Sequence, residues 1–188
     1  GEKAGIIKPG VPLVTSPQQA EARQVIERIA AQRGSPLTQV GRDYTYRRES
    51  SSLDGGQTLM IWDAKEAGRQ PVELRIALLG AHQVENAATA YTALQIARRR
   101  GLKIPAQAIA DGFRQTTWPG RFEILQRNPP VVIDSAHNRD SAHKLRQALD
   151  EYFPELPVIL LFGASEDKDI AGMFAELLPR ASHLVVTK

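Results

Sequence analysis

Apolar residues recur at the spacing of an α-helix in several parts of the chain. Between Ser16 and Gly34 the apolar positions follow the i, i+3, i+4, i+7 pattern of one buried helix face: Ala22, Val25, Ile26, Ile29 and Ala30. This predicts a helix that Ser16 caps, with Gln19 completing a capping box, Pro17 at the first helical position and Gly34 as the stop.

Two more helices are predicted further along, over 83–100 and 105–115. The first of these carries small residues that permit close packing: Ala87, Ala90, Ala93 and Ala97. The sequence TTWPGR (116–121) then breaks the pattern, because a Trp-Pro-Gly run does not continue a helix. This break predicts a hinge or a domain boundary.

The stretch 38–80 has a different pattern, with short runs of alternating apolar and polar residues. In VELRIAL every second residue is apolar and would lie on one side of a strand: Val72, Leu74, Ile76 and Leu78. Asp54-Gly55 is a plausible tight turn. The stretch therefore predicts antiparallel hairpins.

Strands and helices alternate regularly after the hinge. Strands FEIL and VVI precede a helix from about Ser141, with Leu145, Ala148, Leu149, Tyr152 and Phe153 on one face. Strand VILLF, a helix from about Asp169 with Ile170, Met173, Phe174, Leu177 and Leu178, and strand LVVT follow. Continuous apolar strands that alternate with amphipathic helices indicate βαβ units and a mainly parallel sheet, so the predicted fold class is α/β.

Composition adds limits on the class of protein. Of the 188 residues, 42% are hydrophobic and 24% charged, values typical of a globular chain. No apolar run approaches the roughly 18 residues of a spanning helix, and no signal-peptide core follows the charged start, so we expect no membrane segment. Cysteine is absent, which excludes disulfides and thiolate metal sites and fits a cytoplasmic protein.

The net charge of +3 is a weak basic excess. Its densest cluster, Arg98 to Arg100, directly precedes Gly101 and is best explained as the last turn of a helix, where cations complement the helix dipole. Only 6% of residues are aromatic, whereas nucleic-acid patches interleave aromatic with basic residues. We therefore expect no nucleic-acid partner.

Polar side chains follow the predicted strand VVI in the sequence DSAHN. Ligands of open parallel sheets bind beyond the carboxyl ends of the strands, which is where Asp134 would lie, and His137 could hold a proton, a metal or a phosphate oxygen. The alternative is that Asp134 and Ser135 cap the next helix or hold the turn. A serine hydrolase is disfavoured because the sequence contains no G-x-S-x-G elbow.

Two further stretches offer binding groups. In LLGAHQVENAATA (78–90) Asn86 has both a donor and an acceptor for a planar base, although His82 and Gln83 could equally be simple helix caps. Arg121 follows the hinge, and its guanidinium would either lie on the surface or point into an interdomain cleft.

Together and in this order, GAHQVENAATA, WPGR and DSAHN resemble the folylpolyglutamate synthase and dihydrofolate synthase family of the Mur ligase superfamily. EKAGIIKPGVP (2–12) and GASEDKD (163–169) are similar to further segments of that family. The resemblance implies the end of a central ATPase domain over 1–117 and the first half of a Rossmann-like glutamate-ligase domain over 118–188. Gln83 favours the folate branch over the cell-wall ligases, which more often carry Asn there.

The resemblance also implies roles and ligands. Asn86 would contact the adenine of ATP, Arg121 would reach the nucleotide, and Asp134 and His137 would lie at the nucleotide and glutamate side as catalytic groups. Lys3 would be a carbamate near Mg2+, which suits the preference of that cation for anionic oxygens. The implied reaction transfers the γ-phosphate of ATP to a carboxylate of dihydropteroate or a folate, and L-glutamate attacks the acyl phosphate. We expect a cytoplasmic monomer.

One departure from the family limits this expectation. The phosphate-binding G-x-x-x-x-G-K-[ST] loop does not occur in these 188 residues, so we expect the chain alone to be inactive. Two alternatives stay open: a Mur-type peptide ligase of the cell wall, and a non-catalytic nucleotide-binding module that lacks the loop.

Overall fold

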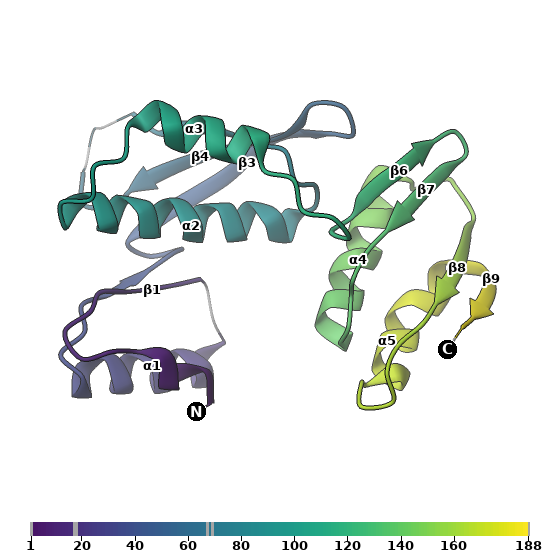
Figure 1. Cartoon of the computed structure of the whole chain (residues 1–188), viewed down its shortest axis with the longest axis horizontal. Helices are drawn as coiled ribbons and strands as arrows, with labels where there is room; N and C mark the ends of the chain where they lie inside the picture. Colours follow the sequence, from purple (N-terminus) through teal and green to yellow (C-terminus); the bar gives the residue numbers. More distant parts are fainter. Residues whose placement is uncertain (1, 17–18, 67, 69, 188) are drawn as a thin grey trace. The chain divides into compact units, whose positions relative to one another are not determined.

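The chain forms two compact units, which are described separately (Figure 1). The computed structural model describes residues 2–16, 19–66, 68 and 70–187, and the side chains of Glu2 and Lys3 lie outside the description. The first unit comprises Gly1–Ser51, Gln57–Ala77 and Gln83–Thr116, and the second comprises Ser52–Gly56, Leu78–His82 and Thr117–Lys188. The second unit thus takes in two short segments that precede the hinge in the sequence.

The first unit begins with a short helix and a parallel strand pair. Its elements are the 3-10 helix η1 (Glu2–Ile6), β1 (Leu13–Thr15), α1 (Ala20–Gln32) and β2 (Leu37–Gln39). β1 pairs with β2 in parallel, with Leu13 opposite Leu37. The prediction of antiparallel hairpins is therefore wrong for β2, because the intervening helix provides the crossover that a parallel pair needs.

The start of α1 differs from the prediction and its end agrees with it. The helix begins at Ala20 and its N-cap residue is Gln19, which makes no side-chain capping bond. The prediction of Ser16 as the cap is therefore wrong, and Pro17 lies outside the described residues. Gly34 follows the helix with φ of 58°, a left-handed conformation that glycine adopts without steric cost and that turns the chain out of the helix.

A three-stranded sheet forms the rest of the first unit with two helices. The strands are β3 (Tyr44–Ser52), β4 (Gly56–Asp63) and β5 (Val72–Ile76), in that spatial order. β4 and β5 are antiparallel, with Leu59 opposite Leu74, and both side chains are buried. The predicted turn at Asp54-Gly55 is confirmed and connects β3 to β4. The hairpin prediction is also confirmed for β4 and β5 by their antiparallel pairing.

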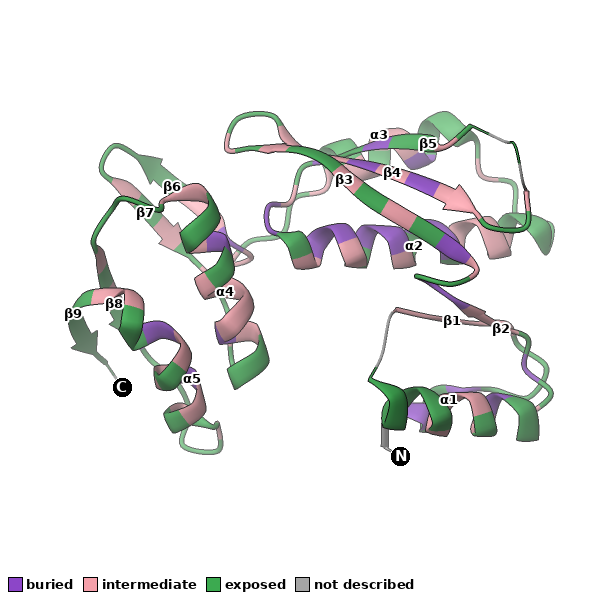
Figure 2. Ribbon diagram, turned by 180° about the vertical axis from the view of Figure 1, so that it is seen from behind, coloured by how far each residue is buried: buried purple, intermediate pink, exposed green. Residues whose placement is uncertain are grey.

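The helices of the first unit are α2 (Ala81–Arg99) and α3 (Ala106–Gln115), close to their predicted bounds. The buried residues of α2 follow one face, as the purple segments of Figure 2 show: Gln83, Val84, Ala87, Ala88, Tyr91 and Thr92. Of the alanines predicted to permit close packing, Ala87 is buried, whereas Ala90 and Ala93 are exposed. The larger apolar surfaces of Val84 and Tyr91 lie on the buried face with Ala87.

The second unit contains two strand pairs and two longer helices. Its elements are β6 (Glu123–Arg127), β7 (Pro130–Ile133), α4 (Arg139–Tyr152), β8 (Val158–Phe162), α5 (Ile170–Leu177), the 3-10 helix η2 (Leu178–Arg180) and β9 (Ala181–Val186). β8 and β9 are parallel across α5, as predicted for a βαβ unit. The prediction of a parallel sheet is wrong for β6 and β7, which are antiparallel because two residues connect them and a parallel pair needs a far longer crossover. The protein is therefore a mixed α/β fold.

Two apolar clusters stabilise the second unit. One joins α4, β8 and α5 through Ala142, Phe162, Met173 and Leu177. The other is centred on Leu79, Phe122 and Ala148, and Leu53 from the β3–β4 turn packs against it. Leu178, predicted on the buried face of α5, lies in η2 with 41% of its surface exposed. Within the described residues, no helix has both the length and the apolar character needed to cross a membrane.

Candidate functional site

Asp134 joins the end of β7 to the hinge. Its Oδ2 accepts a hydrogen bond from the backbone N–H of Phe122, and its Oδ1 accepts one from the N–H of Ala136, both at 2.8 Å. Phe122 has φ of 44°, a conformation that non-glycine residues seldom adopt, and its ring is buried in the second cluster. The carboxylate thus holds a strained hinge residue in place.

Ser135 adds a second link between the same two segments. Its N–H and its hydroxyl both donate to the carbonyl oxygen of Gly120, each at 2.8 Å. The N–H of Gly120 in turn donates to Glu123 Oε2 at 2.7 Å. The hinge and the end of β7 therefore form one hydrogen-bonded structure.

Asn138 caps the helix that follows. Its side chain accepts from the N–H of Ser141, and the Ser141 hydroxyl accepts from the N–H of Asn138, which is a reciprocal capping box. The alternative that Asp134 and Ser135 hold the turn is confirmed, whereas the possibility that they cap the helix is wrong. The cap was missed at the sequence level although Asn138 and Ser141 carry its signature spacing.

His137 lies between these two features with its side chain exposed. Its backbone N–H donates to the Ser141 hydroxyl, and its ring Nδ1 lies 3.1 Å from the carbonyl oxygen of Ser135. If Nδ1 carries the proton, Nε2 is left as a proton acceptor.

Arg121 is the cation of the hinge. Its side chain is half-buried, and within the part of the chain that the structure describes its guanidinium has no hydrogen-bond or ion-pair partner. A guanidinium without a partner beside a strand end can bind an anionic group in two-pronged geometry.

His82 lies near the same charges. Burial lowers the pKa of His82 below its ordinary value of 6.5; the Lys144 and Arg121 cations also lower this pKa, whereas Asp134 and Asp140 oppose the shift. A Cβ atom at Gly80, where φ is 99°, would lie 2.9 Å from the His82 ring, so the glycine leaves room for the imidazole.

Asn86 lies on α2, six positions after Gly80, and belongs to the first unit. Its Nδ2 donates to Oε1 of Gln83 at 3.1 Å. Gln83 is buried, with 8% of its surface exposed, whereas Asn86 is exposed. The alternative that His82 and Gln83 are simple helix caps is wrong, since both lie inside the first turn of α2.

Arg121, Asp134 and His137 thus all lie in the second unit, as does His82, which interacts electrostatically with Arg121 and Asp134. Asn86 belongs to the first unit, and Lys3, whose side chain lies outside the described residues, belongs to it as well. Nothing among the described side chains forms a group of three or more acidic or histidine residues suited to a metal ion. The magnesium ion therefore stays a prediction.

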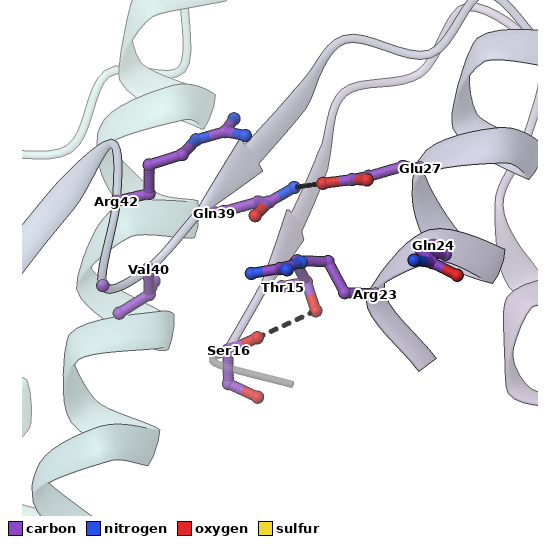
Figure 3. A pocket seen from close by; sticks show the side chains of 9 residues that line it. Thr15, Ser16, Arg23, Gln24, Glu27, Gln39, Val40 and Arg42 are labelled. Carbon is purple, nitrogen blue, oxygen red and sulfur yellow. Dashed lines mark hydrogen bonds between the residues drawn. The ribbon is translucent and has the colours of Figure 1, made fainter. Parts of the chain in front are cut away.

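The first unit has a cavity of about 420 Å³ at the carboxyl ends of β1 and β2 (Figure 3). Figure 3 shows the Gln39 amide directed at Glu27, and its Nε2 donates to the Glu27 carboxylate at 2.7 Å. Arg42, on the same side, pairs with Asp43 at 3.0 Å. None of the residues predicted from the sequence to bind a ligand lines this cavity.

A second cavity, of about 410 Å³, lies in the first unit between the sheet and the ends of α2 and α3. Asp63 is one of its acidic lining groups and pairs with Arg99. Burial acts to raise the pKa of Asp63, but the hydrogen bonds from Arg99, the Lys65 backbone and Tyr44 outweigh it and lower the pKa. These contacts connect the end of α2 to β4, so the pairing of Asp63 with Arg99 has a structural explanation that needs no ligand.

The chain is similar to known proteins along most of its length. Residues 120–188 match the model for the Mur ligase, glutamate ligase domain. The chain is 33% identical over 178 residues to a dihydrofolate synthase/folylpolyglutamate synthase of Bacillus subtilis, covering 94% of this chain and 40% of that protein. It therefore spans about two-fifths of the length of the curated relative.

Solved structures agree. The crystal structure of folylpolyglutamate synthase from Thermotoga maritima matches with a TM-score of 0.79 and 30% identity, over 98% of this chain and 42% of the other. A structure described as an FPGS-AMPPCP-folate complex matches with a TM-score of 0.86 and 30% identity, over 99% and 45% of the two chains. Residues 120–188 therefore match a Mur ligase glutamate ligase domain, and the chain is similar to folylpolyglutamate and dihydrofolate synthases over nearly its whole length.

Proposed function

We propose that the protein works as an ATP-dependent ligase that joins L-glutamate to dihydropteroate, to tetrahydrofolate or to both. The observation that carries the proposal is the unpartnered guanidinium of Arg121, directly before Phe122, whose N–H bonds to Asp134 at the end of a strand. The chain that carries it is similar to folylpolyglutamate synthases over nearly its whole length. This combination favours a nucleotide ligand, because phosphate oxygens suit a guanidinium.

The proposed roles follow from the chemistry of each group. The Asn86 amide reads the adenine, and Arg121 offsets negative charge on the nucleotide. Asp134 accepts two backbone bonds, and a carboxylate has about four acceptor sites, so lone pairs remain for a ligand hydroxyl. His137, exposed and beside the turn, takes the proton of the attacking amine.

The overall reaction balances in two steps. The γ-phosphoryl group passes from ATP to the carboxylate oxygen of the pterin substrate, which releases ADP. The glutamate amine then attacks the acyl carbon, inorganic phosphate leaves, and the amine loses a proton. ATP and Mg2+ are the proposed cofactors, and no step is assigned to the metal, since the described side chains do not form a site for it. We propose that the protein acts as a cytoplasmic monomer.

A chimera tests this function. In the Bacillus subtilis relative, the segment that aligns with this chain is replaced by this chain, and ADP release and glutamate incorporation are measured. We expect both to depend on a folate or dihydropteroate together with L-glutamate, and we expect the isolated 188-residue chain to be inactive. The chimera with Arg121→Ala should lose activity, with Arg127→Ala as the matched control on the exposed strand β6.

Two outcomes would count against the proposal. Activity on a UDP-muramoyl acceptor in place of the folate would favour the cell-wall ligase. A well-folded chimera that binds ATP without releasing ADP would favour a non-catalytic nucleotide-binding module.

A further inference from the structure

Gln83 and Asn86 form a side-chain pair in the first turns of α2. They are three positions apart, which places them on neighbouring points of the helix surface. The Asn86 amino group donates to the Gln83 carbonyl oxygen at 3.1 Å. One partner is buried, with 8% exposure, and the other is exposed.

This hydrogen bond determines which amide atoms of Asn86 are left for other partners. An asparagine amide has two orientations that differ by exchange of its oxygen and nitrogen, and only a hydrogen-bond partner distinguishes them. Because the Gln83 oxygen accepts one N–H of Asn86, the Asn86 oxygen and its second N–H are directed elsewhere. The exposed edge of Asn86 then has a fixed order of acceptor and donor.

We propose that Gln83 is a positioning residue, which fixes the Asn86 amide in the orientation that recognises a 6-aminopurine. Asparagine binds adenine by accepting from the 6-amino group and donating to the adjacent ring nitrogen. A 6-oxopurine has an acceptor in place of that amino group and meets the Asn86 oxygen with repulsion. The inference rests on the proposed nucleotide function and adds the source of its base selectivity.

A selectivity measurement tests the proposal on the 188-residue chain itself. ATP and inosine triphosphate are titrated to millimolar concentrations and binding is followed by NMR, with the unfolding midpoint recorded for every variant. We expect the unmodified chain to prefer ATP by at least about fivefold. Gln83→Met, which has no acceptor oxygen, should bring the ratio of the two affinities close to one.

Two more variants separate positioning from stability. Gln83→Glu keeps an oxygen that accepts from Asn86 and should retain the preference for ATP. In an Asn86→Ala background, Gln83→Met should not change the ratio further, because a positioning residue acts only through its partner. Gln95→Met, the same replacement further along α2, is the matched control and should leave the ratio unchanged.

The outcomes are distinguishable. If the unmodified chain binds neither nucleotide, the same titration is made on the chimera described above, and absence of binding there overturns the proposed nucleotide site together with this inference. Equal affinity for the two nucleotides overturns this inference alone. If it prefers ATP and Gln83→Met keeps that preference, only the inference about Gln83 is overturned. A fall in the ratio that persists in the Asn86→Ala background also overturns the positioning role.

Discussion

Both α2 and α4 begin with polar residues, and the two helices use them differently. Before α4, the side chains of Asp134, Ser135 and Asn138 are bonded to backbone groups of the hinge and the first helical turn. In α2, Gln83 and Asn86 bond to each other, and Asn86 stays exposed. Polar side chains therefore stabilise the backbone before α4, whereas in α2 they leave the Asn86 amide exposed to solvent.

The two segments also differ in backbone strain. The segment before α4 is linked to Phe122, a non-glycine residue with positive φ, whereas the turn before α2 has a glycine at Gly80 where φ is positive. On the α4 side hydrogen bonds hold a strained residue, whereas on the α2 side glycine adopts a positive φ without steric cost.

The largest effect is expected from Asp134→Ala. The change removes the acceptor for two backbone N–H groups, at Phe122 and Ala136, and frees a strained residue. Charge-assisted hydrogen bonds contribute more than neutral ones, so the free energy of unfolding should fall by about 3 kcal/mol in a urea titration. Asp140→Ala, with an exposed carboxylate on α4, is the control and should cost far less. Unchanged stability would show that Asp134 is not structural.

A smaller effect is expected from Asn138→Ala. The helix loses its capping box, and N-cap replacements by alanine cost about 1 to 2 kcal/mol. The unfolding midpoint in urea should shift accordingly, whereas Gln147→Ala, an exposed position on the same helix, should leave it nearly unchanged. A midpoint for Asn138→Ala equal to that of the control would mean that the cap contributes nothing.

The smallest effect is expected from pH, through His82. Burial, with the Lys144 cation second, lowers its pKa in the folded chain below 6.5, so the unfolded chain binds more protons as the pH falls through that value. The free energy of unfolding should therefore decrease between pH 7 and the lower folded pKa, and His82→Gln should flatten this part of the profile. An identical profile for both proteins would contradict the shift and the position of His82 near Arg121 and Lys144.

Much of the fold was predictable from local pattern. The bounds of α2 and α3 and the starts of α4 and α5 came within a few residues of the predicted ones, because helical periodicity is a property of a short stretch of chain. The start of α1 was wrong, because a capping motif such as Ser16 to Gln19 competes with the pairing of β1 that immediately precedes it.

The sequence predicted the candidate residues of the site but not the contacts among them. The sequence identified Asn86, Arg121, Asp134 and His137, and their ligand roles stay predictions. It gave no signal that Asp134 bonds to Phe122, twelve positions earlier, or that His82 lies near Arg121. These relations depend on how β6, β7 and α4 pack, which no local window contains.

The sequence by itself determined the helical periods, the break at Trp118 to Gly120 and the order of the motifs, since each follows from neighbouring residues. Only the tertiary structure decided that residues 52–56 and 78–82 join the second unit and that Leu53 and Leu79 belong to its apolar cluster. It also decided which polar side chains form hydrogen bonds with the backbone. The physical reason is that burial and hydrogen bonding are satisfied by partners distant in sequence, whereas periodicity and capping signals are written within a few turns of the chain.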